Sequence, residues 1–247
     1  MSALIQQLHK LISEEFLDDE DEAYRGELLP GLLADELAAL AAQVPTAALP
    51  QDIEELLRYS KGLTFGWLEE VRFDAFSDFG RLGLFLACVE LTHDGAGNYW
   101  VLNINQAGQW GAVFYVCHDP QVIVKQADNL LDFLMQLQEY GRLKSASRFD
   151  EVYERLSSKI WQERATHTGL MKAAVLVAST DTVLRQFAAQ QSSDFLIADL
   201  RTESATQGFA YHKFFKNRQL QINKHELEPI WAFEPPPPSW FSRLLGR

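Results

Sequence analysis

The sequence predicts an α+β fold, in which an antiparallel strand meander packs against helices and a smaller α/β C-terminal extension follows. In the first 60 residues, apolar side chains recur at helical spacing. Farther along, the pattern changes to short runs of β-branched and aromatic residues separated by turn-forming residues. The length of 247 residues allows two domains. We therefore predict a first domain over residues 1–145, an α/β extension of unknown role over 146–234, and a proline-rich spacer with a basic amphipathic tail over 235–247.

Three helices are expected before the strands begin. The first lies within residues 4–12, where apolar residues recur on one face. The second covers residues 32–44, and the third begins after Pro50, because proline is tolerated in a first helical turn. This start lacks the basic segment and unbroken apolar stretch of a secretory signal peptide. We therefore expect a cytoplasmic protein.

The middle of the chain is typical of an antiparallel meander followed by a helix. Strands are predicted over residues 81–92, 99–104 and 112–117, with a further short strand at 122–124. Turn-forming residues separate the first three strands, as expected for consecutive antiparallel strands. The helix is predicted over residues 129–140 and carries one apolar face.

The C-terminal extension has a different order of elements. Ser147, with Asp150 three residues later, resembles a capping box that opens a helix running through Arg164. Beyond it, the pattern predicts a strand–helix–strand order typical of a small βαβ unit. The expected positions are residues 173–178 for a buried strand, 182–190 for the helix and 195–200 for the second strand, with further strands of the unit at 208–215 and 219–222.

After four consecutive prolines, the tail combines large apolar side chains with arginines. The apolar residues are Trp240, Phe241, Leu244 and Leu245, and the basic residues are Arg243 and Arg247. Such a segment could dock on a membrane surface or in a partner groove. Nine residues are too few to hold a helix alone, so a disordered tail is the other expectation.

Acidic residues outnumber basic ones and are concentrated in one part of the chain. The sequence holds 34 acidic and 22 basic side chains, which gives a formal net charge of −12. Residues 1–150 carry −14 and residues 151–247 carry +2. Such an acidic surface repels phosphate groups, which excludes nonspecific binding of nucleic acid or of anionic membranes. The asymmetry favours two parts with different roles.

Two cysteines, Cys88 and Cys117, each lie within an apolar run. We expect both to be buried reduced thiols, because two cysteines build neither a disulfide framework nor a cysteine-rich zinc site. The longest apolar runs, at residues 82–89 and 173–178, are far shorter than the roughly 18–20 residues that cross a bilayer. No membrane span is therefore predicted.

Sequence motifs of the common enzyme classes are incomplete in this chain. It has no Gly-x-Ser-x-Gly elbow, phosphate-binding loop or His-Glu-x-x-His pair, and Gly95 and Gly97 do not continue into a dinucleotide fingerprint. His93 and His118 each precede an aspartate, but their spacing matches no usual metal site. The neighbours Cys117 and His118 would point to opposite faces of a strand. We predict no catalytic residue, no metal and no cofactor, and hence no enzyme.

Four motifs follow one another in the first domain. They are Leu49-Pro50-Gln51-Asp52-Ile53-Glu54-Glu55-Leu56-Leu57 with Ser60-Lys61-Gly62; Asp94-Gly95-Ala96-Gly97-Asn98-Tyr99-Trp100-Val101-Leu102-Asn103; Gly111-Ala112-Val113-Phe114 with His118-Asp119; and Asn129-Leu130-Leu131-Asp132-Phe133-Leu134. In this order and spacing they resemble the signature of the SUKH superfamily over about residues 30–140. Its members are the relatives of the fungal cell-wall assembly regulator, and many of them are bacterial immunity proteins.

The resemblance implies an α+β fold and a non-enzymatic function. We therefore predict a protein-binding module of the SUKH type, in the form of an immunity protein that neutralises a bacterial toxin. An acidic binding face would suit a basic toxin, because complementary charge speeds encounter and adds specificity. Two alternative functions stay open: an enzyme or small-ligand-binding protein with a site between the two parts, and a regulatory scaffold without a toxin partner. With any of these functions, the C-terminal extension could form a homo-oligomer.

Acidic side chains interleaved with aromatic ones make up the candidate partner-binding face. Its residues are Trp67, Glu69, Glu70, Asp74 and Asp78. The alternative for this stretch is a partly buried strand and loop with a solvated acidic side.

A second group of residues is expected to have a structural role in a turn between two strands. They are Asp94, Gly95, Gly97 and Asn98. The glycines permit positive φ, and the polar side chains of Asp94 and Asn98 can bond nearby backbone amides.

Overall fold

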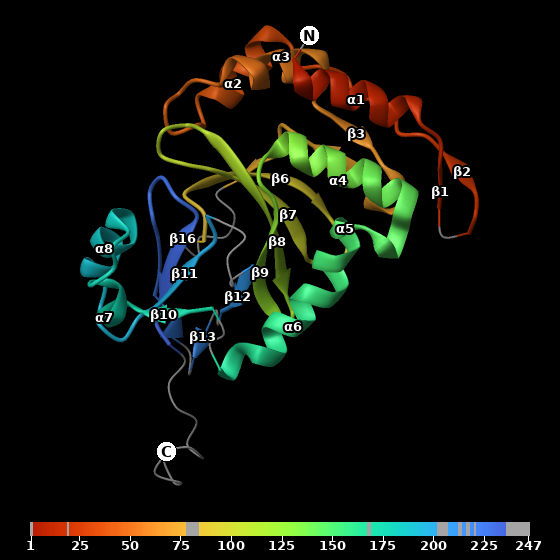
Figure 1. Ribbon diagram of the computed structural model, residues 1–247. Coiled ribbons are helices and arrows are strands. Elements are labelled where there is room, and N and C mark those ends of the chain that lie inside the picture. Colours follow the sequence, from red (N-terminus) through yellow and green to blue (C-terminus); the bar gives the residue numbers. More distant parts are fainter. Residues whose placement is uncertain are drawn as a thin grey trace.

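Helices and sheets are stacked in four layers in the computed structural model of the chain (Figure 1). The structure describes residues 2–18, 20–77, 84–166, 169–201, 207–211, 214–215, 218–219 and 221–235. Helices cover one face of a six-stranded sheet, a four-stranded sheet covers its other face, and two short helices cover the four-stranded sheet. The predicted α+β fold with a strand meander is confirmed. None of the described helices is long and apolar enough to cross a bilayer.

Three helices precede the main strands, as the sequence predicts. They are α1 (Ala3–Ser13), α2 (Ala34–Ala41) and α3 (Gln51–Tyr59). The Ser2 hydroxyl caps α1 by accepting a hydrogen bond from the backbone N–H of Ile5 at 3.4 Å. The apolar stripe of α1, with Leu8 and Leu11 fully buried, packs against α4 (Leu130–Leu143). The helix α4 confirms the prediction for residues 129–140.

Two small hairpins follow α1 and α3 in the sequence. One pairs β1 (Phe16–Leu17) with β2 (Ala23–Tyr24), and the other pairs β3 (Gly62–Thr64) with β4 (Glu70–Arg72) on either side of the 3-10 helix η1 (Gly66–Leu68). The buried residues of the second hairpin belong to the core beneath the helices. This hairpin carries most of the candidate partner-binding residues.

The central sheet has the strand order β12–β9–β8–β7–β6–β5, and every neighbouring pair is antiparallel. Its strands are β5 (Phe76–Ser77), β6 (Ala87–His93), β7 (Tyr99–Ile104), β8 (Trp110–His118), β9 (Gln121–Ala127) and β12 (Gly208–Ala210). The strands β6 to β9 confirm the predicted meander. The first of them begins at Ala87 rather than at residue 81, and residues 81–83 lie outside the described part of the chain.

The middle strands of this sheet are buried on both faces, which explains their nearly continuous apolar sequence. On β8, Val113 and Tyr115 belong to the core beneath the helices. Phe114 and Val116, which alternate with them, belong to the core shared with the four-stranded sheet. Because side chains alternate along a strand, a sheet with two buried faces needs apolar residues at successive positions.

The helix predicted to begin at Ser147 forms in consecutive parts. They are α5 (Arg148–Asp150), the π-helical stretch η3 (Glu151–Leu156) and α6 (Ser157–Gln162). The Ser147 hydroxyl accepts a hydrogen bond from the backbone N–H of Asp150 at 3.2 Å. Phe149 and Val152 are fully buried in the core beneath the helices. Contacts therefore cross the predicted boundary at residue 145, and the division into domains stays a prediction.

The second sheet has the strand order β10–β11–β16–β15. Its strands are β10 (Met171–Lys172), β11 (Leu196–Asp199), β15 (Ile222–Lys224) and β16 (Ile230–Phe233), and α8 (Thr182–Ala189) lies between β10 and β11 in the sequence. The helix and β11 agree with the prediction. All neighbouring pairs are antiparallel, whereas a βαβ unit needs parallel strands. The predicted βαβ unit is therefore wrong.

The strand predicted at residues 173–178 is also wrong, because this run forms the helix α7 (Ala173–Leu176). Ala173 and Leu176, three positions apart, are buried, whereas 57% of Val175 and 44% of Val177 are exposed. That spacing is helical. A six-residue apolar run cannot be assigned to strand or helix from periodicity alone.

The strand β12 joins a different sheet from the one expected. The sequence pattern places it in the C-terminal unit, but it pairs with β9 of the central sheet, and Gly208 lies opposite Val124. A Cβ atom at Gly208 would clash with the carbonyl oxygen of Ile123 and lie 2.8 Å from Cδ1 of Ile160 on α6. Glycine therefore permits this close approach. A separate hairpin follows, made of β13 (Phe214–Phe215) and β14 (Arg218–Gln219).

Lys224 is a buried lysine on the edge strand β15. Only 9% of it is exposed, and its Nζ lies 5.4 Å from the centre of the Trp231 ring. Nζ donates hydrogen bonds to the backbone carbonyls of His225 at 3.1 Å and Glu228 at 3.3 Å. Burial lowers the pKa of Lys224 to about 8, although the carboxylate of Glu228 opposes this effect.

We predict that Lys224 makes the free energy of unfolding rise between pH 8 and pH 10.5. In this range the folded chain has released the lysine proton and the unfolded chain still holds it, so stability increases with pH. The full effect is about 3 kcal/mol. Chemical denaturation of the wild type and of Lys224→Met from pH 7.5 to pH 9.5 measures it.

The comparison with Lys224→Met separates this lysine from other groups that titrate in the same range. The wild type should gain about 2 kcal/mol relative to the variant over this interval. The exposed Lys159 on α6 is the matched control, and Lys159→Met should follow the wild type. Parallel stability curves for the wild type and Lys224→Met would contradict the prediction.

Candidate functional site

An acidic cavity of about 220 Å³ lies between the β3–β4 hairpin and the strands β6 and β7. Three glutamates line it, Glu69 and Glu70 from the hairpin and Glu90 from β6. We name this cavity the acidic pocket. Its other lining residues are Arg72, Ala75, Leu91, Thr92, His93 and Tyr99. Among the described residues that line it, Arg72 is the only lysine or arginine.

Glu69 has an uncommon backbone conformation where η1 ends. Its φ of 57° lies in a region that residues with a side chain rarely adopt. The Glu69 N–H donates to the Gly66 carbonyl at 3.2 Å, and the Phe65 N–H donates to the Glu69 carbonyl at 3.0 Å. These bonds hold the turn in place. Strained residues tend to cluster at binding sites, which makes Glu69 the candidate of most interest.

Arg72 neutralises part of the negative charge at the acidic pocket. Two of its nitrogens donate to the Asp74 carboxylate at 2.8 and 2.9 Å, and a third lies 3.4 Å from Glu70. These hydrogen bonds, chiefly the one with Asp74, raise the pKa of Arg72. Asp74 is occupied by this ion pair and only 13% of its side chain is exposed. Within the described residues, Glu69 and Glu90 form no ion pair.

The remaining candidates, Trp67 and Asp78, lie elsewhere. Trp67 is held in an aromatic cluster, where its Nε1 donates to the Tyr140 hydroxyl at 2.7 Å and its ring packs against Trp100 and Tyr153. It is still 37% exposed. Asp78 lies outside the described part of the chain. The structure thus brings Glu69 and Glu70 into one pocket, ties Asp74 to Arg72, and gives Trp67 a packing role.

Glu90, His93 and Tyr99 could not be assigned to the site from the sequence. They come from β6 and β7, and the pairing register places His93 opposite Tyr99. The backbone N–H of Glu90 donates to the Ala75 carbonyl at 2.9 Å, next to β5. The available signal was a half-buried glutamate in a strand whose preceding residues are apolar, since charged residues are seldom placed there without a reason.

The turn between β6 and β7 has the geometry expected from its sequence. Gly95 and Gly97 have φ values of 74° and 90°. The Asp94 carboxylate accepts a hydrogen bond from the backbone N–H of Asn98 at 3.1 Å. The side-chain amide oxygen Oδ1 of Asn98 in turn accepts one from the backbone N–H of His118 at 3.0 Å. These residues therefore connect the β6–β7 turn to the end of β8.

The two cysteines lie in the apolar interior of the fold. Cys88 and Cys117 are buried free thiols, as predicted. Burial raises the pKa of the Cys117 thiol, and its neighbour His118 is exposed. Within the described ranges, no group of three or more His, Cys, Asp or Glu side chains is arranged to hold a metal ion.

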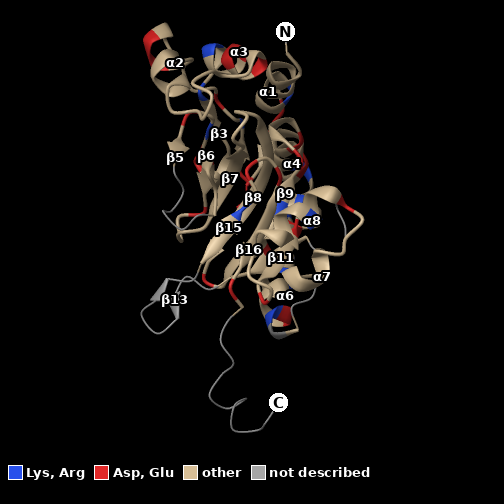
Figure 2. Ribbon diagram, turned by 90° about the vertical axis from the view of Figure 1, so that its left-hand side faces the viewer, with Lys and Arg blue, Asp and Glu red and all other residues tan. Residues whose placement is uncertain are grey.

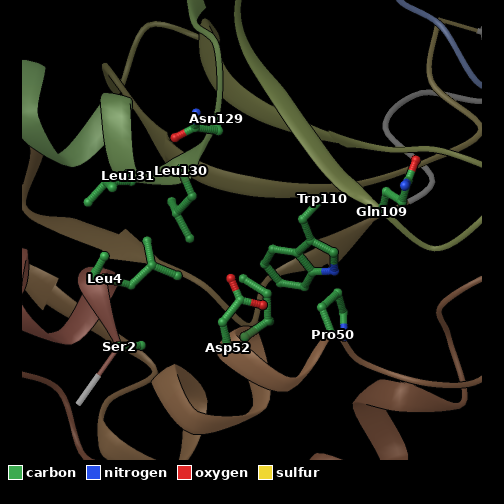
Figure 3. A pocket seen from close by; sticks show the side chains of 11 residues that line it. Ser2, Leu4, Pro50, Asp52, Gln109, Trp110, Asn129, Leu130 and Leu131 are labelled. Atoms are coloured by element: carbon green, nitrogen blue, oxygen red, sulfur yellow. The ribbon is translucent and has the colours of Figure 1, made fainter.

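A larger cavity, of about 450 Å³, lies where α1, α3 and α4 begin. We name it the helix-start cavity. In Figure 3 the side chains of Leu4, Asp52, Trp110 and Leu130 surround the same space. Asp52 is the one charged residue among the described residues that line it. The Trp110 Nε1 is buried, and no described group accepts a hydrogen bond from it.

Comparison with known proteins does not supply a relative for this chain. No protein family, curated protein or solved structure matches it. The two cavities must therefore be interpreted from their own residues.

We predict that Glu69→Gly raises the free energy of unfolding by about 1 kcal/mol, because glycine adopts positive φ without the steric cost that other residues pay. Thermal or denaturant unfolding of the two proteins measures the difference. Glu70→Gly is the matched control on the adjoining strand β4 and should lower stability, since glycine weakens a strand. Equal destabilisation by both substitutions would show that Glu69 is not strained.

Proposed function

We propose that this chain is a non-enzymatic protein-binding module of the SUKH type, and that its acidic pocket receives a basic surface of a protein partner. One observation carries the proposal: Glu69, Glu70 and Glu90 converge on a cavity that holds a single arginine. That arginine, Arg72, already forms an ion pair with Asp74. The pocket therefore keeps an excess of negative charge that a lysine or arginine side chain would neutralise.

The charge distribution of the chain also favours a basic partner at this part of the surface. Residues 1–150 carry a net −14, and Figure 2 shows acidic residues on α2 and α3 and close to the strands β5 and β6. A field of one sign steers an oppositely charged protein toward the surface and raises the association rate. Binding by this face should accordingly weaken as salt screens the charges.

The class of partner follows from the resemblance to SUKH proteins. Many of these neutralise a bacterial toxin, and a basic toxin in the cytoplasm would fit an acidic face. A regulatory scaffold without a toxin partner would use the same face, and the identity of the bound protein distinguishes the two. Oligomerisation through the C-terminal part stays a prediction.

The contact between the two sheets supports a binding module over an enzyme with a site at that junction. Rings of Phe85, Phe114, Phe209 and Trp231 fill the layer between the sheets. A catalytic site there would instead need a polar cleft with convergent ionisable groups.

We expect that neutralising the acidic pocket removes the partner. Affinity capture from the cells of origin, read by mass spectrometry, would compare the wild type with Glu69→Gln/Glu90→Gln. The wild type should retain a basic protein, and the variant about ten-fold less of it, because loss of well-placed charge pairs at an interface costs about 1.4 kcal/mol or more. Retention should also fall between 50 and 300 mM salt.

The matched control changes two exposed acidic residues outside both the pocket and residues 1–150, Glu154→Gln/Asp194→Asn. This control should retain the partner at the wild-type level. Equal loss in both variants would show that net charge alone, not the acidic pocket, holds the partner. Turnover of a small molecule without any protein partner would contradict the proposed function itself.

A further inference from the structure

The helix-start cavity is not explained by the proposed function. Its volume of about 450 Å³ falls within the range of small-ligand sites, roughly 300–1,000 Å³. None of the described residues that line it also lines the acidic pocket. The cavity is therefore a second candidate site, and its own residues determine which ligand it suits.

One side of the cavity is an apolar wall that belongs to the core beneath the helices. Leu4, Ile53 and Leu130 line the cavity and are buried in that core. Trp110 and Leu131 also line it, and they are half-buried and pack against the same core. Core side chains are closely packed, so this wall exists before a ligand arrives. The apolar part of a ligand would leave water by contacting it.

Asp52 supplies the charge of the cavity. It is the one charged residue among the described residues that line it, and in Figure 3 its side chain and that of Trp110 surround the same space. The ion pair of α3 joins Arg58 to Glu54, and no described lysine or arginine pairs with Asp52. A carboxylate beside an apolar wall, with no basic partner among the described residues, favours a cationic group that can form a charge-assisted hydrogen bond.

An anion is less suitable, although the starts of three helices would by themselves favour one. The Ser2 hydroxyl accepts a hydrogen bond from the Ile5 N–H, and the Asn129 side chain accepts one from the Asp132 N–H, so the first turns of α1 and α4 are capped. The first turn of α3 contains Asp52. An anion in the cavity would therefore meet a carboxylate.

A bare metal ion is also less suitable. Ca²⁺ and Mg²⁺ take about six or more oxygen ligands, whereas Asp52 is the one carboxylate among the described lining residues. A metal ion would also make no use of the apolar wall. The ligand that uses the wall and the carboxylate together is an organic cation.

We propose that the helix-start cavity binds a small organic cation, namely a protonated amine joined to an aromatic or aliphatic group. The ammonium group pairs with the carboxylate of Asp52, and the apolar group lies against Leu4 and Leu130. The indole of Trp110 adds to the binding, because the face of this ring attracts cations more strongly than that of other aromatic side chains. This inference does not rest on the proposed function, which concerns the acidic pocket.

The test compares three probes of similar size that differ in charge: 2-phenylethylammonium, 2-phenylethanol and phenylacetate. Nuclear magnetic resonance titrations of the full-length chain at pH 7 give the affinity and the position of each. 2-Phenylethylammonium should bind at least about ten-fold more tightly than 2-phenylethanol, and phenylacetate more weakly than either. The backbone amide signals of residues 52–53 and 130–131 and the indole N–H signal of Trp110 should shift with one dissociation constant.

Removing the carboxylate should remove the preference for the cation. Asp52→Asn should weaken binding of 2-phenylethylammonium at least about ten-fold and leave binding of 2-phenylethanol unchanged. Glu55→Gln is the matched control, because it removes an exposed carboxylate from the same helix outside the cavity; it should bind as the wild type does. Glu69→Gln/Glu90→Gln should also bind the probe normally, so the two proposals can fail independently.

Filling the cavity should block both the charged and the neutral probe. Leu131→Trp places a larger side chain in the space and should weaken binding of each at least about ten-fold. Met135→Trp makes the same change one turn farther along α4, at an exposed position, and should bind as the wild type does. Unchanged signals from the strands β6 to β9 would show that both variants are folded.

Three results would overturn the proposal. The first is equal affinity for 2-phenylethylammonium and 2-phenylethanol, or no shift of the cavity signals by the amine. The second is an unchanged affinity of Asp52→Asn for the amine, since a general attraction of cations to the acidic part of the chain would then explain binding. The third is tighter binding of phenylacetate, which would assign the cavity to anions.

Discussion

Contact between the two sheets is the interaction on which the rest of the structure depends. The Trp231 ring on β16 lies 5.2 Å from Phe114 on β8 and 5.6 Å from Phe209 on β12, measured between ring centres. Its Nε1 donates to the Leu84 carbonyl at 2.7 Å, so the one polar atom of the ring is satisfied. Each buried aromatic ring of this kind stabilises the fold by about 2 kcal/mol. The four-stranded sheet is therefore the cover for the second face of the central sheet.

This arrangement determines where binding can occur. Helices occupy one face of the central sheet and the second sheet occupies the other, so both faces of its middle strands are covered over most of their length. The acidic pocket forms where the β3–β4 hairpin meets β6 and β7. The helix-start cavity lies where α1, α3 and α4 begin. The proposed binding of a basic partner at the acidic pocket follows from this restriction.

Much of the fold could be predicted from local sequence patterns, but the pairing of strands that lie far apart in the sequence could not. The apolar stripe of α1, the β6–β9 meander and the positive φ of Gly95 depend on neighbouring residues, so they could be derived from the sequence. The pairing of β12 with β9 joins residues more than 80 positions apart, and its signal is one glycine, Gly208. Two residues of the acidic pocket, Glu69 and Glu70, could be grouped from the sequence because they are neighbours in it. Glu90 and Tyr99 could not, because only the strand register places them beside these glutamates.

Residue-resolved native-state hydrogen exchange of the full chain tests the account most directly. If the layer around Trp231 joins the two sheets, the slowest amides of β8 in the central sheet and of β11 and β16 in the second sheet should open with the same free energy, in one cooperative unit. Trp231→Ala should then lower the opening free energy of both sheets together, by about 3–5 kcal/mol. Exchange of β11 and β16 through a separate opening of lower free energy, with β8 still protected, would contradict the account.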